Sequence, residues 1–226
     1  PPYNERENIT DLVKEIFLQV PEVSVLIVDD HSPDGTAQAV RELQKSFPHL
    51  HLIERHQKDS LGGAYIRGFR EVLRDPAVGK IITMDADFSH APRYIPKLLE
   101  LGQDAELVIG SRYVVGGGIR EWELWRRFLS RAGNFYVRCI LGLGVHDWTS
   151  GFTCIDTQLL RTVQLSQIDL SGYAFLQELK YLLLRSGARV REYPIIFEAR
   201  RNGESKISAF IIREGIIGPW KIRNRK

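Results

Sequence analysis

The feature that most constrains the fold is an alternation of short β-branched apolar runs with amphipathic stretches over the first two thirds of the chain. Residues 23–28 (Val-Ser-Val-Leu-Ile-Val) predict a buried strand, and residues 36–47 carry apolar side chains at helical spacing. The same pattern predicts strands at 51–54, 80–84 and 107–109 and helices at 62–73 and 92–101. Because strands that alternate with helices form a mostly parallel sheet with helices on both faces, the sequence predicts an α/β fold.

The last third of the chain has a different texture. Glycines at 116–118 interrupt the alternation, and residues 122–141 predict a long helix rich in basic and aromatic side chains. Residues 173–185 predict another helix and residues 190–197 a strand. The stretch 207–217 has apolar clusters at helical spacing, which predicts an amphipathic helix that can lie in an interface. We therefore expect an α/β domain over residues 1–206 and a basic, amphipathic interface segment over residues 207–226.

Length and charge narrow the class of protein. A chain of 226 residues with 43% hydrophobic content is long enough to bury one substantial core. The net charge of +3 is too small to indicate a nucleic-acid partner. Residues 189–226, however, hold ten Lys or Arg against four Asp or Glu. That excess favours an anionic membrane or an anionic substrate, and a solvated surface is the alternative.

The chain offers little sign of export or membrane insertion. Its two cysteines cannot form a disulfide framework and have no metal-ligand spacing, which indicates a reducing compartment such as the cytosol. No apolar run reaches the ~18 residues that a membrane-spanning helix needs, and no signal peptide is visible. Any membrane contact made by these residues is therefore expected to be peripheral.

Two carboxylates follow the strand predicted at 80–84 directly, in the order Asp85-Ala86-Asp87. Where the pleat of a strand ends, side chains two residues apart can point the same way. Two hard oxygen ligands then face the outgoing edge of the sheet, where Mg²⁺ or Mn²⁺ could join them to a diphosphate. The alternative is a solvated loop, because a D-x-D sequence is common.

A second acidic pair, Asp29-Asp30, follows the strand predicted at 23–28. Buried carboxylates need hydrogen-bond donors, which a ribose or a base edge would supply. The alternative is helix capping, because Asp30, Ser32 and Asp34 all precede a helix. Glu5 offers one more acceptor near the first strand.

Seven motifs, in this order and spacing, resemble the family-two glycosyltransferases of GT-A (Rossmann-like) fold, and more narrowly the dolichyl-phosphate (polyprenyl-phosphate) mannose synthases. The resemblance covers nearly the whole chain. The motifs are Pro-Pro-Tyr-Asn-Glu-Arg-Glu-Asn at 1–8, Val-Asp-Asp-His-Ser-Pro-Asp-Gly-Thr at 28–36, Leu-Gly-Gly-Ala-Tyr at 61–65, Met-Asp-Ala-Asp-Phe-Ser-His-Ala-Pro at 84–92, Gly-Ser-Arg-Tyr at 110–113, Asp-Trp-Thr-Ser-Gly-Phe at 147–152 and Arg-Arg-Asn-Gly-Glu-Ser-Lys at 200–206.

The resemblance implies a role for each matching residue. The donor's nucleoside would be held by Pro1, Tyr3, Glu5, Val28 and Asp30. Metal and diphosphate would be held by Asp85, Ala86 and Asp87, with Asp85 and Asp87 as metal ligands. The phosphate and sugar region would be lined by Arg112, Arg200 and Lys206, and Asp87, Arg112 and Arg200 would act in catalysis. The acceptor phosphate would meet Arg112, Arg126, Ser130 and Arg131.

Two departures from the family pattern could alter sugar or lipid preference. Thr153 and Leu176 stand where many members carry Arg and Gln. The family fold also begins with a strand just before the first motif, so we expect a strand ahead of Pro1 that this sequence does not contain.

The implied activity is transfer of mannose from GDP-mannose to dolichyl or polyprenyl phosphate, with inversion and with Mg²⁺ or Mn²⁺. A phosphate monoester is already an anion at neutral pH, so it needs no strong general base. It does need cations that hold two anionic reactants together, a task suited to arginine. The implied location is the cytosolic face of a membrane, either endoplasmic reticulum or prokaryotic plasma membrane. A membrane-anchoring subunit or a transmembrane segment outside this chain would be a further partner.

Three alternatives stay open. A polyprenyl-phosphate glucosyl- or aminosugar transferase would keep the fold and use a UDP-sugar. A non-catalytic subunit that binds lipid phosphate would not need the Asp85 and Asp87 pair. A dinucleotide oxidoreductase is the weakest alternative, because no G-x-G-x-x-G follows the first strands.

Overall fold

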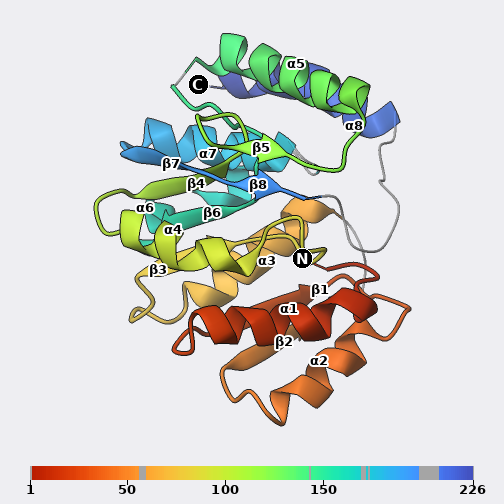
Figure 1. Cartoon of the computed structure of the whole chain (residues 1–226). Helices are drawn as coiled ribbons and strands as arrows, with labels where there is room; N and C mark the ends of the chain where they lie inside the picture. The colour runs from red at the N-terminus through yellow and green to blue at the C-terminus, as the bar shows by residue number, and fades with distance from the viewer. Residues whose placement is uncertain are drawn as a thin grey trace.

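The computed structural model describes residues 2–55, 60–142, 144–168, 172, 174–198 and 209–225, and it is an α/β structure (Figure 1). The first half contains α1 (Arg6–Gln19), β1 (Val25–Asp29), α2 (Thr36–Gln44), β2 (Leu50–Glu54), α3 (Leu61–Val72), β3 (Lys80–Thr83), the 3₁₀ turn η1 (Pro92–Tyr94), α4 (Ile95–Leu101) and β4 (Leu107–Ser111). The second half contains β5 (Gly118–Ile119), α5 (Leu124–Leu141), β6 (Thr153–Asp156), α6 (Thr157–Thr162), the 3₁₀ turn η2 (Leu165–Gln167), α7 (Ala174–Arg185), β7 (Val190–Pro194), β8 (Ile196–Phe197) and α8 (Ala209–Arg223).

The strands form three groups in which parallel pairs are the more frequent. β1 pairs in parallel with β2, β4 with β7, and β5 with β8. β6 runs antiparallel between β3 and β4 and was not predicted. The prediction of an α/β fold is therefore confirmed, and β6 adds an antiparallel strand to its centre.

Local sequence signals set several helix ends. The Ser60 hydroxyl accepts the Gly63 N–H at 3.0 Å at the start of α3, and Asp156 accepts the Leu159 N–H at 3.0 Å at the start of α6. Both are N-cap contacts that satisfy a free helix donor. Gly142 ends α5 in a left-handed conformation (φ 60°) that glycine tolerates.

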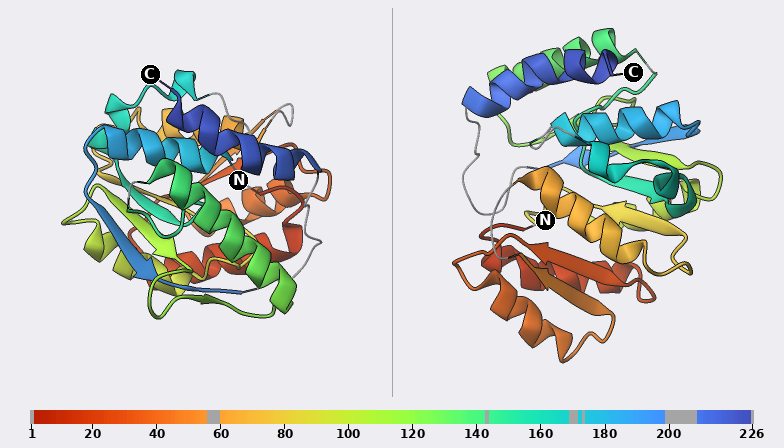
Figure 2. Two further views of the ribbon diagram at one scale, coloured as in Figure 1. Left: turned by 90° about the horizontal axis from the view of Figure 1, so that it is seen from above. Right: turned by 180° about the vertical axis from the view of Figure 1, so that it is seen from behind.

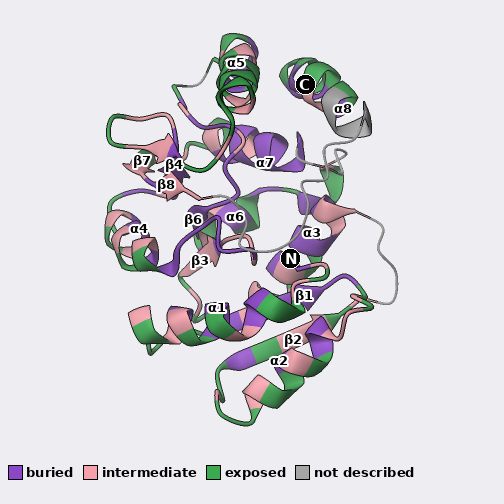
Figure 3. Ribbon diagram, turned by 45° about the vertical axis from the view of Figure 1, so that its right-hand side comes forward, coloured by how far each residue is buried: buried purple, intermediate pink, exposed green. Residues whose placement is uncertain are grey.

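Two apolar clusters form the core. One joins α1, β1 and α4 around Ile9, Val13 and Leu98. The other joins α5, α7 and β4 around Leu141, Phe175 and Leu107. Figure 3 shows buried residues in purple on helices such as α7 and on strands such as β1.

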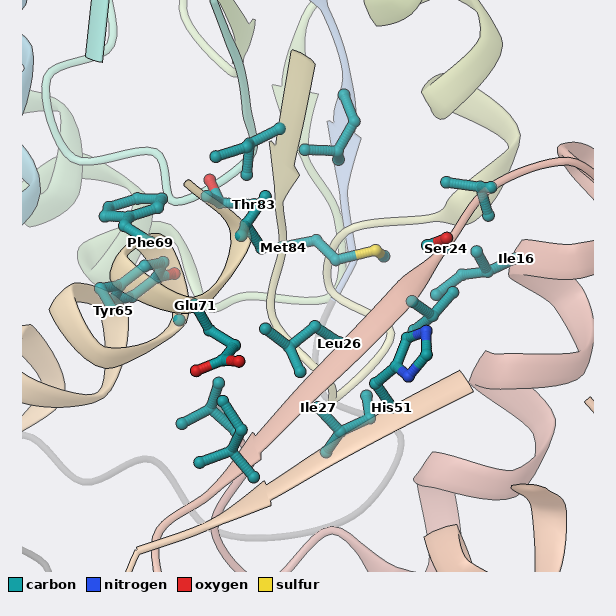
Figure 4. A pocket seen from close by; sticks show the side chains of 18 of the residues that line it. Ile16, Ser24, Leu26, Ile27, His51, Tyr65, Phe69, Glu71, Thr83 and Met84 are labelled. Atoms are coloured by element: carbon teal, nitrogen blue, oxygen red, sulfur yellow. The ribbon is translucent and has the colours of Figure 1, made fainter. Parts of the chain in front are cut away.

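An apolar cavity of about 620 Å³ lies between β1 and β3. Figure 4 shows Leu26 and Ile27 of β1 on one side and Thr83 and Met84 on the other. Among the described residues, β1 pairs with β2 and β3 pairs with β6, so each strand has one edge toward this cavity.

Helix α8 packs against α5 and α7, and with α5 it forms the uppermost layer of the molecule (Figures 1 and 2). The Tyr136 hydroxyl donates to the Ile216 carbonyl at 3.0 Å, and Trp220 Nε1 donates to the Tyr136 hydroxyl at 2.9 Å. In the part of the chain described here, no helix is both long enough and apolar enough to cross a bilayer. The division of the chain at residue 206 stays a prediction.

Candidate active site

The loop after β3 holds the two carboxylates of the D-x-D motif. Asp87 is 3% exposed, and its Oδ1 accepts the Ser89 N–H at 3.1 Å and the Ser89 hydroxyl at 2.5 Å. The Asp85 side chain is 40% exposed. Phe88, which lies between Asp87 and Ser89 in the chain, has a left-handed backbone (φ 64°), which is a strained conformation for a bulky residue. The loop therefore fixes Asp87 and leaves Asp85 open to the surface, at the end of the strand where both were predicted.

The imidazole of His90 stabilises the D-x-D loop. Its Nδ1 accepts the Asp85 N–H at 3.0 Å and lies 3.6 Å from Asp85 Oδ2. The imidazole is buried, stacks on Phe152 at 5.1 Å and meets the edge of Phe197 at 5.5 Å. Burial lowers the pKa of His90 and outweighs the attraction of Asp85 and Asp87, so the ring is neutral at pH 7 and can accept that N–H. No role for His90 was predicted, although it lies only five residues after Asp85.

The acidic pair after β1 divides into two roles. Asp29 accepts the Ser32 N–H at 2.9 Å and the Ser32 hydroxyl at 2.6 Å, so it shapes its own turn. Asp30 is buried, and Arg55 Nη1 lies 2.5 Å from its Oδ1. Asp34 accepts the N–H and the hydroxyl of Thr36, the first residue of α2, whose N-cap position is Gly35. Asp30 is instead an acceptor at the end of β1 with a cationic partner.

The loop before α1 is fastened to the loop after β1. The Asn4 N–H donates to the Ser32 hydroxyl at 3.1 Å, and the Glu5 N–H donates to the Thr36 hydroxyl at 3.1 Å. The Glu5 carboxylate accepts the Asn8 side-chain amide at 2.8 Å. Tyr3 and Glu5 thereby lie beside the carboxyl end of β1.

The nucleoside and diphosphate predictions fall at one end of the β1–β3 cavity. Its lining includes Pro2, Val28, Asp85 and Ala86. The structure therefore brings the predicted residues of both loops to the same edge of the fold, as expected for the carboxyl ends of parallel strands. Pro1, Arg200 and Lys206 lie outside the described residues.

Arg112 lies one residue after β4 and is fixed by a buried carboxylate. Its Nε donates to Asp147 Oδ2 at 2.8 Å and its Nη2 donates to Asp147 Oδ1 at 2.7 Å, in the two-pronged geometry of arginine with a carboxylate. Its backbone N–H also donates to Asp147 Oδ2 at 3.0 Å, and its Nη2 donates to the Thr149 hydroxyl at 2.5 Å. Gly117, in the glycine run at 116–118, allows a close backbone approach beside Arg112, because a Cβ at this position would lie 2.6 Å from the Ser111 carbonyl oxygen.

The pKa shifts show how tightly this pair is coupled. Burial lowers the pKa of Arg112, but the charge and hydrogen bonds of Asp147 more than compensate, and the pKa is raised overall. Burial raises the pKa of Asp147, and Arg112 reverses that shift, so the pKa is lowered from its ordinary 3.8. Both groups are therefore charged across the neutral pH range.

The predicted acceptor-phosphate residues lie next to one another around aromatic rings. The Arg112 guanidinium lies 5.2 Å from the centre of the Tyr113 ring and 5.2 Å from that of Phe197. The Tyr113 hydroxyl shares a hydrogen bond of 2.6 Å with Ser130, and the pKa of Tyr113 is raised by burial against the opposing charges of Arg112 and Arg131.

Arg126 extends the same cluster along α5. Its guanidinium lies 4.1 Å from the Trp122 ring, which meets Phe197 edge-on at 5.7 Å. Arg126 and Trp122 therefore form one wall with Phe197 and Arg112.

The loop at 146–151 carries Asp147 and is held from several sides. Glu192 of β7 accepts the N–H of His146 at 2.8 Å and that of Asp147 at 3.0 Å. Asn134 of α5 accepts the Trp148 N–H at 2.9 Å. Lys180 of α7 donates to the carbonyls of Trp148 and Ser150. None of Glu192, Asn134 and Lys180 was predicted to serve the site.

This loop also connects the two halves of the site. A Cβ on Gly151 would lie 3.5 Å from Asp85 Oδ1 and 3.5 Å from the Tyr65 hydroxyl. The Thr83 hydroxyl, at the end of β3, donates to the Gly151 carbonyl at 2.7 Å and shares a hydrogen bond of 2.7 Å with Thr153. Thr153, one of the two departures from the family pattern, thus ties β6 to the strand that ends at the D-x-D loop.

Comparison with known proteins supports these motifs. Residues 1–163 match the family described as Glycosyl transferase family 2. Polyprenol monophosphomannose synthase from Mycolicibacterium smegmatis is 42% identical over 230 residues, which cover 100% of this chain and 86% of that protein. Undecaprenyl-phosphate mannosyltransferase from Micrococcus luteus is 41% identical over 217 residues, which cover 96% of this chain and 89% of that protein.

Solved structures share the architecture at lower sequence identity. A complex of glucosyl-3-phosphoglycerate synthase from Mycobacterium tuberculosis has a TM-score of 0.68 at 18% identity, covering 100% of this chain and 77% of that one. A mannosyltransferase from Pyrobaculum calidifontis, in complex with GDP-Man and Mn²⁺, has a TM-score of 0.65 at 19% identity, covering 100% of this chain and 63% of that one. The chain therefore belongs to glycosyl transferase family 2, and its α/β architecture is the GT-A fold.

Proposed function

We propose that this chain transfers mannose from GDP-mannose to a polyprenyl phosphate, with inversion at the anomeric carbon. The observation that carries the proposal is the likeness, over nearly the full chain, to two proteins named for mannose transfer to polyprenyl phosphates. The site agrees with it, because carboxylates at the D-x-D loop adjoin a wall of arginine and aromatic side chains. A sugar nucleotide would occupy the first part and a lipid phosphate the second.

The two carboxylates Asp85 and Asp87 fit a divalent cation whose remaining ligands come from the substrate. Among the described residues, no group of three or more His, Cys, Asp or Glu side chains could hold a metal alone. Asp85 and Asp87 would therefore hold Mg²⁺ or Mn²⁺ together with phosphate oxygens, which is the usual arrangement for a cation bound with a nucleotide. When bound, the metal would act as a Lewis acid toward the departing diphosphate.

The residues of the chain would position the reactants. The acceptor phosphate is its own nucleophile, so proton removal by a strong base is not required. Arg112 is pre-oriented by Asp147, which limits the entropy lost when the phosphate binds. One attack from the side opposite the leaving group would invert the sugar configuration.

The donor can be tested directly. Purified protein is expected to transfer radiolabelled sugar from GDP-mannose to a short polyprenyl phosphate in the presence of Mg²⁺ or Mn²⁺. It is expected to turn over UDP-glucose at least about a hundredfold more slowly, a rate difference that corresponds to ~2.7 kcal/mol of transition-state free energy. Transfer from UDP-glucose alone would favour the UDP-sugar alternative. NMR analysis of the product reports whether the anomeric configuration is inverted.

We further propose that α5 and α8 contact the membrane surface that holds the acceptor. Large apolar side chains are exposed on both helices, among them Trp125 (63%) and Phe128 (76%) on α5 and Trp220 on α8. Exposed basic residues accompany them, namely Arg127, Arg131, Lys221 and Arg223. Apolar side chains beside basic ones are typical of helices that lie in the interface of an anionic bilayer.

Removing part of this surface is expected to weaken membrane binding. The double variant Trp125→Ser/Phe128→Ser should bind vesicles that contain anionic lipid at least about tenfold more weakly, because two large side chains lose their apolar burial. Co-sedimentation at low and high salt measures this, and binding should fall as salt rises. The control is Leu18→Ser, which changes an exposed apolar residue of α1 at the other end of the molecule. Equal binding by both variants would remove α5 from the proposed contact.

A further inference from the structure

Lys180 is a buried cation at the centre of α7. It is 2% exposed, and its neighbours Leu179 and Tyr181 are buried as well. Its Nζ donates to the Trp148 carbonyl at 2.9 Å and to the Ser150 carbonyl at 2.5 Å. A buried ammonium without partners would be very costly, so both contacts are needed to keep this residue inside the core.

The two carbonyls flank Thr149, and Asp147 lies just before them. Arg112 donates to both Asp147 and Thr149. The Lys180 amine therefore holds the backbone of the short segment whose side chains orient the Arg112 guanidinium. Without the N–H donors of Lys180, the buried carbonyl groups of Trp148 and Ser150 would lose these hydrogen bonds next to the candidate site.

Nearby charges shift the pKa of Lys180 in both directions. Burial lowers its pKa to about 7, against the attraction of Asp147 and Glu192 and with the repulsion of Arg112. On α7 itself, Glu178 pairs with Arg225 beyond the end of α8. Among the titratable groups on helices packed against α7, Glu214 of α8 accepts the Gly172 N–H, and Tyr65 of α3 stacks on Phe175 of α7.

We infer that Lys180 is a positioning residue for the acceptor phosphate. Its ammonium fixes the 147–151 loop and adds a positive charge next to Arg112, whose own charge is neutralised by Asp147. Arg112 and Asp147 together are neutral, so the ammonium adds a positive charge to these three groups, and the nearby Glu192 carboxylate offsets part of it. This inference rests on the proposed function, because the acceptor phosphate is the anion that would benefit. The donor diphosphate would lie toward Asp85 and would be affected less.

The direction of the pH effect follows from the lowered pKa. The ammonium is present below pH 7 and is lost as pH rises through that value. A neutral amine keeps two N–H donors for the two carbonyls, so mainly the charge disappears. The KM for polyprenyl phosphate is therefore expected to rise between pH 7 and 9. The acceptor phosphate itself loses its second proton near ~6, which works in the opposite direction and below this window.

The test compares Lys180→Gln, which keeps an N–H donor without the charge, with Lys180→Met, which removes both. For Lys180→Gln we expect a KM for polyprenyl phosphate raised about tenfold at pH 6, as for the loss of a charged contact. That KM should no longer change between pH 7 and 9, and the KM for GDP-mannose should stay within about twofold. The matched control is Lys80→Met, which changes a lysine paired with Asp156 at the opposite end of β3 and should keep the wild-type pH profile.

Each outcome decides the inference. A Lys180→Gln profile that still follows the wild-type rise, or equal losses toward donor and acceptor with a lowered melting temperature, would assign Lys180 a purely structural role. If both Lys180 variants fail to fold, NMR titration of the lysine side chains in the wild type replaces them. One lysine should then titrate near pH 7, and polyprenyl phosphate should raise its pKa; an unchanged titration overturns the inference. Wild-type protein that transfers no mannose would instead refute the proposed function.

Discussion

Replacing Asp87 with alanine is expected to reduce mannose transfer by at least about a thousandfold, because a lost metal contact costs several kcal/mol of transition-state stabilisation. The carboxylate is buried and fixed by Ser89, so water cannot easily take its place. Radiolabel transfer at saturating GDP-mannose measures the loss. Chelation of divalent ions in the wild type should have an effect of similar size, and Mg²⁺ or Mn²⁺ should restore activity.

The variant Asp87→Asn separates charge from loop structure. An asparagine oxygen can still accept the Ser89 N–H and hydroxyl, so the turn around Phe88 should persist. We expect this variant to melt close to the wild type, and to bind Mn²⁺ in the presence of GDP at least about tenfold more weakly. Asp104→Ala, which removes an exposed carboxylate after α4, is the control. Full activity of Asp87→Ala would return the non-catalytic subunit as the better hypothesis.

The parts of the fold that the sequence predicted are those with local signals. The strands that became β1 and β3 are runs of apolar residues, and the long helix at 122–141 became α5 with a start two residues later. The four residues of β6 follow a polar loop directly and have no pattern longer than Thr-Cys-Ile-Asp. Their conformation depends on β3 and β4, to which they pair from 44 or more residues away, as Ile109↔Thr153 and Lys80↔Asp156 show. Strands of two residues, such as β5 and β8, carry even less local information.

The site divides in the same way. Asp85, Asp87 and Asp30 follow strands directly, so periodicity alone places them at the carboxyl edge of the sheet. The partner of Arg112 lies 35 residues away, and Lys180 lies 32 residues from the Trp148 carbonyl that it holds. Such pairings arise only from tertiary packing. One signal was available: Lys180 stands in a mostly apolar stretch of α7, with Leu179 before it and Tyr181 to Leu184 after it, where a lysine is unusual unless it has buried partners.

Replacing Arg112 with methionine is expected to abolish transfer and to destabilise the protein. The substitution removes the guanidinium that pairs with the buried Asp147 carboxylate, and breaking a buried ion pair in this way typically costs about 3–5 kcal/mol. Burial raises the pKa of Asp147, and the charge and hydrogen bonds of Arg112, together with the charge of Lys180, lower it overall. In the wild type, its stabilising contribution is lost only as pH falls below the ordinary value of 3.8, so this pair cannot cause an activity change near pH 7. Thermal melting and radiolabel transfer measure the two effects separately.

The double variant Arg112→Met/Asp147→Leu distinguishes stability from function. Removing both charges leaves no unpaired ion, and apolar replacements of buried ion pairs are often neutral or stabilising. We therefore expect the double variant to regain most of the thermal stability that Arg112→Met loses, yet to remain at least about a hundredfold less active than the wild type, because the phosphate loses its oriented guanidinium. Activity that returned together with stability would mean that Arg112 serves the fold alone. The acceptor phosphate would then depend on the arginines of α5, which Arg126→Met and Arg131→Met would test in turn.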